Sequence, residues 1–351
     1  MAEIEKLMNV AIGDIEKIMN IATDDIEKVM GLEIPSAGWT GTRGILSGGN
    51  TSGAGGPWIS STGTVDIHYK SIASTDGMSD FGDLSGNNTS HSSTSNGSRG
   101  LIMGGNTGTT DYNKIEYITI GSTGDVADAG DLTEAKYTHV PSSNGTIALI
   151  WGGNNASDAK LDVIEYITIN STSDATDFGD ISTGGVAYQG GSVNDATYAL
   201  RYHGGTNASF WGNKYIDYVT MASTGDSSDF GDMLADGAKG MGGCEDTTRG
   251  VMWGHMVSGA TTNVIEYVTT ASAGDSTDFG DMDTKTHNDH GGANAVSNLT
   301  KGEVYGGILD ASPYYAVARV EYITIASTGN ATNAGDDLIN NRGFISSMSG
   351  T

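Results

Sequence analysis

The chain has 351 residues, 53 glycines, 4 prolines, 1 cysteine and a formal net charge of -26. Glycine does not recur at every third position, which excludes collagen, and 37% apolar residues in short β-branched runs exclude a disordered chain. The negative charge disfavours nucleic acid and anionic membranes as partners. No run reaches about 18 apolar residues, the N-terminus lacks a signal-peptide pattern, and Cys244 has no partner for an intrachain disulfide. We therefore expect neither membrane insertion nor Sec-dependent export.

Residues 1–35 are predicted to form a short α-helical arm built on an 11-residue repeat, whose copies are Ile4–Asn9, Ile15–Asn20 and Ile26–Gly31. Asp14 and Asp25 stand where N-caps belong, and Asn or Gly ends each copy, where a left-handed residue closes a helix. This favours three short helices. The alternative is one continuous helix, for which an 11-residue period implies a right-handed supercoil.

Each copy of the arm repeat places apolar side chains on one helix face, which is too small to be buried on its own. The surface that covers it is its own propeller, sister subunits in a homo-oligomer, or a host structure. The predicted partner-binding residues are Ile4, Leu7, Met8, Ile15, Ile18, Met19, Ile26, Val29 and Met30.

Residues 36–351 contain a second repeat of about 50 residues, the length of a propeller blade. Its most regular part is a strand of the type Ile-Glu-Tyr-Ile-Thr-Ile. A Ser-Thr-Gly-Asp turn and an Asp-Phe-Gly-Asp segment follow, which predicts a tight hairpin into an outer strand. A run ending at a glycine pair precedes the strand, and a weaker strand such as Thr138–Ser143 lies further upstream. The copies of the regular strand are Ile67–Ile72, Ile115–Ile120, Ile164–Ile169, Ile216–Met221, Ile265–Thr270 and Val320–Ile325.

Four short strands repeated six times predict an all-β, six-bladed β-propeller. Residues 342–348 match the first strand of a blade, whereas residues 42–49 begin at the second. We therefore expect the C-terminal strand to become the innermost strand of the blade built from residues 42–84, and so to close the ring.

The glycine-pair strand, the tyrosine-bearing strand and the aromatic residue near the end of each unit resemble kelch repeats over residues 36–351. The sequence departs from that family at Phe81, Phe178, Phe230 and Phe279, where kelch repeats usually have tryptophan, and at Ala129 and Ala334. The Ile-Glu-Lys-x-Met arm resembles the amino-terminal attachment segments of phage virion proteins, and the blades look like those of marine phage tail and head appendages. This resemblance implies a protein made in the host cytoplasm and attached to a virion protein through its arm.

The polar residues give little support to catalysis or metal binding. Turn carboxylates such as Asp226 recur in nearly every blade, which favours turn capping over a calcium site. Arg43, Arg99 and Arg249 share one repeat position, which favours a structural role over the arginine triad of a sialidase-like enzyme. His287 and His290 have ligand-like spacing, but we interpret them as part of a solvated loop. No catalytic residue, metal site or cofactor is predicted.

The repeat fails in the connections that follow the glycine pairs. In kelch-like propellers these loops share one face with the connections that contain Tyr137, His139, His287 and His290. Variable loops on a fixed scaffold are typical of binding surfaces, and aromatic rings beside Asn and Asp suit sugar rings; the alternative is that the aromatics only close the loops over blade edges. The predicted ligand-binding residues are Trp58, Tyr112, Phe210, Trp211, Tyr314 and Tyr315.

Together these patterns predict a non-enzymatic phage virion protein. It would be a tail- or head-attached appendage whose propeller binds a glycan-like or protein ligand on the host surface, or decorates the particle. The first alternative is a cellular or secreted kelch-like protein-interaction module. A carbohydrate-active enzyme is the less favoured one.

Overall fold

The computed structural model describes residues 42–50, 63–182, 190–202, 213–235, 242–257, 260–283, 286–287, 294–309, 315–335, 338–339 and 341–350. All of them lie within Ser36–Thr351. The helices predicted for residues 1–35 lie outside the described residues. No helix in the described part of the chain is long and apolar enough to cross a bilayer.

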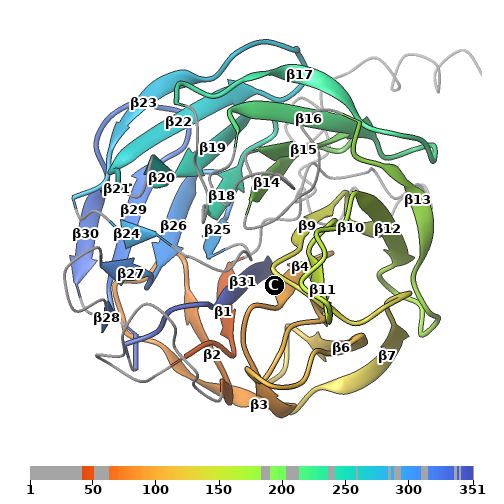
Figure 1. The fold of residues 1–351 in the computed structure, drawn as a ribbon. Coiled ribbons are helices and arrows are strands. Elements are labelled where there is room, and N and C mark those ends of the chain that lie inside the picture. The colour runs from red at the N-terminus through yellow and green to blue at the C-terminus, as the bar shows by residue number, and fades with distance from the viewer. Residues whose placement is uncertain are drawn as a thin grey trace, which may run out of the picture. The chain divides into compact units, whose positions relative to one another are not determined.

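The described residues form a six-bladed β-propeller (Figure 1), in which each blade is a four-stranded antiparallel sheet. From the innermost strand outward, blade 1 consists of β31 (Ser346–Gly350), β1 (Arg43–Ser47), β2 (Thr64–Ser71) and β3 (Ser79–Asn88). Blade 2 consists of β4 (Ser92–Ser95), β5 (Arg99–Met103), β6 (Lys114–Thr119) and β7 (Ala127–Asp131). Blade 3 consists of β9 (Val140–Ser143), β10 (Ile147–Trp151), β12 (Val163–Thr168) and β13 (Thr176–Asp180).

The remaining blades repeat this order. Blade 4 consists of β14 (Gly191–Asn194), β15 (Tyr198–Tyr202), β16 (Tyr215–Thr220) and β17 (Ser228–Asp232). Blade 5 consists of β18 (Gly242–Glu245), β19 (Arg249–Trp253), β22 (Val264–Thr269) and β23 (Thr277–Asp281). Blade 6 consists of β25 (Ala295–Ser297), β26 (Lys301–Tyr305), β29 (Val320–Thr324) and β30 (Thr332–Gly335). The sequence predicted both the blade count and the outer strands.

The core of the molecule lies between the blades. Both faces of the third strand of a blade are covered, as in β6, where Ile115, Glu116 and Ile118 are buried and Tyr117 is half-buried. Successive side chains of a strand point to opposite faces of the sheet, and each face packs against a neighbouring blade. Each apolar cluster therefore combines two neighbouring blades: Leu101 of blade 2, for example, shares a cluster with Ile167 of blade 3.

The ring closes through the C-terminal strand. β31 pairs with β1 in an antiparallel register that places Ser346 opposite Ser47 and Gly350 opposite Arg43. The innermost strand of blade 1 thus comes from the end of the chain and its other three strands come from the beginning. This is the place that the sequence predicted for the C-terminal motif.

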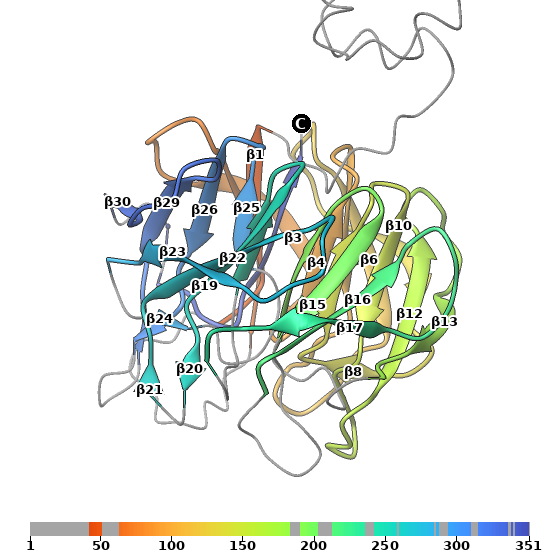
Figure 2. The same cartoon turned by 90° about the horizontal axis from the view of Figure 1, so that it is seen from above.

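The antiparallel strands give the propeller two different faces (Figure 2). The tight hairpins that join the first to the second strand in blades 2–6, and the third to the fourth strand in every blade, lie on one face, which we call the turn face. The loops between the second and third strands and the connections between blades, where the structure describes them, lie on the other face, which we call the loop face. Three small sheets add to the loop face: β8 (Lys136–Tyr137) with β11 (Asn154–Asn155), β20 (Met256–Val257) with β21 (Ala260–Thr261), and β24 (Thr286–His287) with β27 (Ile308–Leu309) and β28 (Tyr315–Ala316). The chain enters the propeller at the turn face, because Arg43 at the start of β1 pairs with Ser71 at the end of β2.

Candidate functional site

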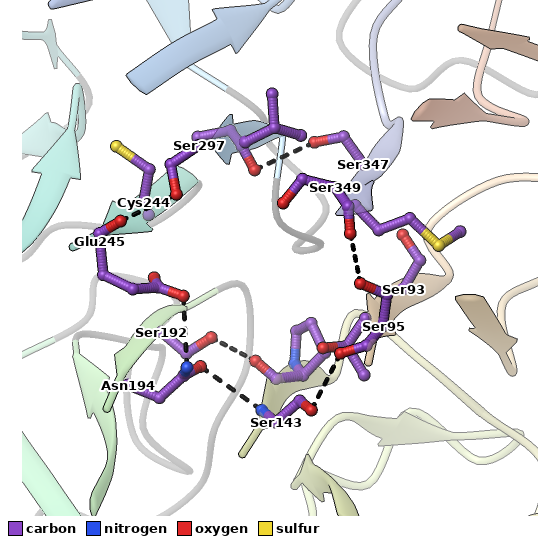
Figure 3. Close-up of a pocket in the computed structure, with 16 residues that line it drawn as sticks. Ser93, Ser95, Ser143, Ser192, Asn194, Cys244, Glu245, Ser297, Ser347 and Ser349 are labelled. Atoms are coloured by element: carbon purple, nitrogen blue, oxygen red, sulfur yellow. Dashed lines mark hydrogen bonds between the residues drawn. The ribbon is translucent and has the colours of Figure 1, made fainter. Parts of the chain in front are cut away.

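The innermost strands of all six blades surround a central channel (Figure 3). Its volume is about 60 Å³, and because a water molecule takes up about 30 Å³ in the liquid, that is room for about two waters. Small polar side chains dominate the wall, among them Ser93, Ser95, Ser143, Ser192, Ser297, Ser347 and Ser349. A sugar ring or a peptide does not fit into such a space.

Serine hydroxyls of the channel link neighbouring blades. Ser143 Oγ donates to the carbonyl of Ser95 at 3.1 Å, and Ser95 Oγ donates in turn to the carbonyl of Ser349 at 2.5 Å. On the opposite side of the ring, Ser297 Oγ donates to the carbonyl of Glu245 at 2.8 Å. These bonds satisfy backbone groups at the inner edge of the ring, so the hydroxyl ring serves the scaffold.

Glu245 is the one carboxylate among the residues that line the channel. At its register position the neighbouring blades have Asn194 and Ser297, which are neutral. Asn194 Nδ2 donates to Glu245 Oε1 at 3.2 Å. Burial raises the pKa of Glu245 to about 8, and the nearby Asp246 and Asp195 act in the same direction. The channel thus holds a single weak acid, which is protonated for about half of the time near pH 8.

The carboxylates of the Ser-Thr-Gly-Asp turns bind the neighbouring blade. Asp226 Oδ1 accepts a hydrogen bond from the backbone N–H of Asp180, in the outer strand of the preceding blade, at 2.9 Å. In the same turn, the N–H of Gly225 donates to the carbonyl of Phe178 at 2.8 Å. Four further interfaces have the same side-chain bond: Asp125 to Asp83, Asp174 to Asp131, Asp275 to Asp232, and Asn330 to Asp281. These turn side chains therefore cap a strand of the preceding blade, whereas the sequence favoured capping of their own turn.

The repeated glutamate of the third strand makes a second link of this kind. Glu116 accepts from the N–H of Ser85 at 3.3 Å, Glu266 from Leu234 at 3.0 Å and Glu321 from Asp283 at 2.9 Å. The glutamates are buried, and each accepts a hydrogen bond from a backbone amide of the preceding blade, which offsets part of the cost of burying the carboxylate. Blade 4 has the shorter Asp217 at this position, and there Ser227 Oγ accepts from the N–H of Ser182 at 2.9 Å instead.

The repeat-position arginines make contacts within the scaffold, the structural role that the sequence favoured. Arg43 Nη1 donates to the carbonyl of Ile120 in the next blade at 2.7 Å, and Arg249 Nη1 to that of Ile325 in the next blade at 3.0 Å. The guanidinium of Arg99 lies 3.6 Å from the ring centroid of Tyr117, within blade 2. These three side chains belong to three different blades and do not converge on a common point.

The described histidines and Cys244 are buried within the scaffold. His91 and His139 are fully buried, and burial lowers the pKa of both imidazoles, to about 3 for His91. Trp253 Nε1 donates to Cys244 Sγ at 3.2 Å, and burial raises the pKa of that thiol. Within the described ranges no three His, Cys, Asp or Glu side chains form a group able to hold a metal ion. His290 and the side chain of His287 lie outside them.

Of the predicted ligand-binding aromatics, Tyr112 is the one whose side chain is described. It is half-buried on the loop face, and Lys114 Nζ lies 4.5 Å from its ring centroid. The backbone of Tyr315 belongs to β28, but its side chain is not described. Trp58, Phe210, Trp211 and Tyr314 lie outside the described residues, so the structure does not test whether these aromatics come together.

A polar group that the sequence did not single out lies near Tyr112, between blades 2 and 3. Tyr137 Oη donates to Asp158, and Asn154 Nδ2 donates to Tyr137 Oη at 3.5 Å. Asp111 lies close enough to Asp158 for the two charges to interact; burial and this neighbour raise the pKa of Asp111. The sequence placed Tyr137 on this face but gave no signal for the group as a whole, because its members come from three different connections.

Comparison with known proteins gives no family for the chain: no family model matches the sequence, and no curated protein matches it.

Proposed function

We propose that the protein is a non-enzymatic appendage of a phage virion, in which a kelch-like propeller displays its loop face to a host-surface ligand. The observation that supports this most is the distribution of the blade repeat: some parts of the blade have the same residues in nearly every copy, and others differ from blade to blade. It is kept at the contacts between blades, such as those of Asp226 and Glu266. It is lost in the loops of the loop face, opposite the face at which the chain enters the propeller.

The placement of the polar residues supports a display function over catalysis. Groups that enzymes use, such as Arg249, Glu266 and His91, are engaged in the contacts between blades or buried there. The central channel is narrow, and burial raises the pKa of the Cys244 thiol that lines it, which disfavours the nucleophilic thiolate there.

A ligand rich in hydroxyl groups suits the described part of the loop face. Tyr112 offers an aromatic ring, while Asp111, Tyr137 and Asp158 offer hydrogen-bonding groups within the same region. Sugars present both apolar C–H faces and hydroxyl edges to such surfaces. Contacts of this kind are individually weak, and many copies on one particle would multiply them. In this proposal residues 1–35 supply the attachment to the virion.

Two measurements test the proposal. Immunogold labelling with antibody against residues 36–351 should mark a fixed position on purified virions; label confined to cells would favour the cellular interaction module. A glycan array, with binding to host cells as a second readout, should detect a ligand that Trp211→Ala, Tyr314→Ala and Tyr112→Ala each weaken. Because exposed contacts contribute little to folding, the three variants should change the free energy of unfolding by less than about 1 kcal/mol. A large loss of stability without a loss of binding would assign the aromatics to packing.

A further inference from the structure

The interface between blade 6 and blade 1, which we call the closure interface, differs chemically from the other five. At each of those, an apolar residue of the second strand of one blade shares a cluster with an apolar residue of the third strand of the next blade. The pairs are Ile45 with Ile118, Leu101 with Ile167, Leu149 with Val219, Leu200 with Val268, and Val251 with Ile323. At the closure interface the same two repeat positions hold Glu303 and Lys70.

These two charges are buried and face each other. The side chains of Lys70 and Glu303 are 1% and 0% exposed, and Lys70 Nζ lies 3.7 Å from Glu303 Oε2. Blade 6 adds two donors to the same carboxylate: Tyr305 Oη at 2.9 Å and Lys301 Nζ at 2.6 Å. Lys301 Nζ also donates across the interface to the carbonyl of Ile72 at 3.0 Å.

We infer that Lys70 and Glu303 form a charge key. During folding, this pair makes the face of blade 6 that contains Glu303 pack against blade 1 and against no other blade. If blade 6 docked on any other blade, Glu303 would meet an aliphatic side chain such as Ile118 or Ile167, and its carboxylate would lose its partner from the neighbouring blade. If another blade docked on blade 1, Lys70 would be buried against a residue such as Leu101 or Leu149. In the first case Glu303 would keep its bonds to Tyr305 and Lys301 of its own blade but lose Lys70, and in the second Lys70 would lose the carboxylate that faces it. Removing one partner of a buried ion pair is strongly unfavourable, so both wrong pairings are penalised.

Such a charge key prevents the wrong pairing of blades that a repeated sequence allows during folding. The blades have similar sequences, so their faces are similar in shape and in apolar character, and a partly folded chain can pair the wrong blades within one copy or between copies. Misassembly of this kind is a characteristic failure of repeat proteins. At these two repeat positions, opposite charges occur at the closure interface alone among the six. The correct closure therefore keeps the ion pair, whereas any other pairing of these two faces sets a charge against an aliphatic side chain. The inference concerns assembly of the ring and does not depend on the proposed function.

The test removes the key from the full-length chain. The variant that we call keyless combines three substitutions: Lys70→Ile, Glu303→Leu and Tyr305→Phe. The first two give the closure interface the apolar residues of the other five interfaces. The third removes the tyrosine hydroxyl that would otherwise lose its acceptor. The matched control is Arg201→Met with Asp217→Glu. It removes another buried ion pair, whose residues face each other on β15 and β16 within blade 4 and do not cross an interface. It installs the residues that blade 5 has there, Met252 and Glu266. The Glu266 carboxylate accepts from the N–H of Leu234 and from Ser276 Oγ, and blade 4 has the corresponding groups at Ser182 and Ser227.

Each protein is unfolded in guanidinium chloride and diluted, and the fraction that regains the elution volume and near-ultraviolet circular dichroism of the never-unfolded sample is measured. We expect wild type and control to recover equally, and the keyless variant to recover less by about threefold or more, although its unfolding midpoint is at least that of wild type. Equal recovery of the keyless variant would overturn the inference. If that variant does not fold at all, the double variant Lys70→Met with Glu303→Gln replaces it, because the glutamine keeps the hydrogen bonds of residue 303. Its recovered fraction is then compared with that of wild type in the same way.

Discussion

At the scale of single residues, Leu299 holds a left-handed backbone conformation for which two of its repeat equivalents have glycine. Its φ is 69°, against 85° for Gly97 and 83° for Gly145 in the corresponding turns. The turns are otherwise alike: Asn298 Oδ1 accepts from the N–H of Lys301 at 2.8 Å, as Asn96 does from Arg99. A left-handed conformation costs a residue with a Cβ atom roughly 1–2 kcal/mol, so the turn is strained at this one position.

We therefore expect Leu299→Gly to stabilise the protein by about 1 kcal/mol. For a domain of this size that corresponds to a rise in Tm of about 2 °C. The reverse change, Gly145→Leu, is the matched control and should lower Tm, since it introduces the same strain elsewhere. A lower Tm for Leu299→Gly would show that the exposed leucine side chain contributes more than its backbone strain costs.

Glu245 gives the channel a measurable pH dependence. Its folded pKa of about 8 lies above its ordinary value of 4.5 because of burial. The folded state therefore binds more protons than the unfolded chain between these two values, and the free energy of unfolding falls as pH rises through this window. Glu245→Gln removes the titration, so the variant should gain stability relative to wild type from pH 5 to pH 9. Guanidinium unfolding at both pH values measures the difference, and the buried histidines, present in both proteins, cancel from the comparison. A constant difference between the two proteins would contradict the raised pKa.

At the scale of the structural element, the turn that follows each third strand is linked to the preceding blade by a side-chain oxygen. This link depends on the oxygen as a hydrogen-bond acceptor more than on its charge. The fifth of the described links uses Asn330 Oδ1 where the other four use aspartate. We expect Asp226→Asn to preserve the bond to the N–H of Asp180, and Asp226→Ala to lose roughly 0.5–1.5 kcal/mol, the net value of a typical hydrogen bond. Thermal unfolding of both variants checks this.

The same pair separates the structural interpretation from a calcium site. Asp226 is one of the charges that raise the pKa of Asp180, so Asp226→Asn should also lower that pKa, as carboxyl NMR titration would show. If Asp226 instead bound calcium, wild type would be stabilised by calcium and Asp226→Asn would abolish that effect.

The sequence predicted the elements well because their signals are local. The alternation in strands such as Ile115–Ile120, the glycine pairs and the turn residues each fix a conformation within a few positions. It did not predict what the turn carboxylates bind. Asp226 and Asp180 are 46 positions apart, whereas a local sequence pattern indicates only that an Asp in a turn caps that same turn. The charged pair of Lys70 and Glu303 was missed for the same reason, since each residue becomes notable only when the repeats are aligned across a known interface.

At the scale of the whole molecule, closure by a strand from the other end of the chain makes the ring depend on β31. Met348 is 4% exposed and belongs to the apolar cluster between blades 1 and 2, with Ile45 and Ile118. Ser346 Oγ and Ser93 Oγ are 2.6 Å apart, which links β31 to blade 2 as well. Removing β31 therefore leaves β1 as an unpaired inner edge and opens a cavity at the first interface.

We expect truncation of residues 346–351 to lower Tm by roughly 10 °C or more, because losing a buried methionine alone costs about 2–5 kcal/mol and the strand pairing is lost with it. A synthetic peptide of residues 341–351 added in trans should restore much of the loss, since a ligand that binds only the folded ring stabilises it by mass action. A peptide of the same composition in scrambled order should not. An unchanged Tm after truncation would mean that the six blades hold together without closure, and that the contacts between neighbouring blades alone determine the stability of the propeller.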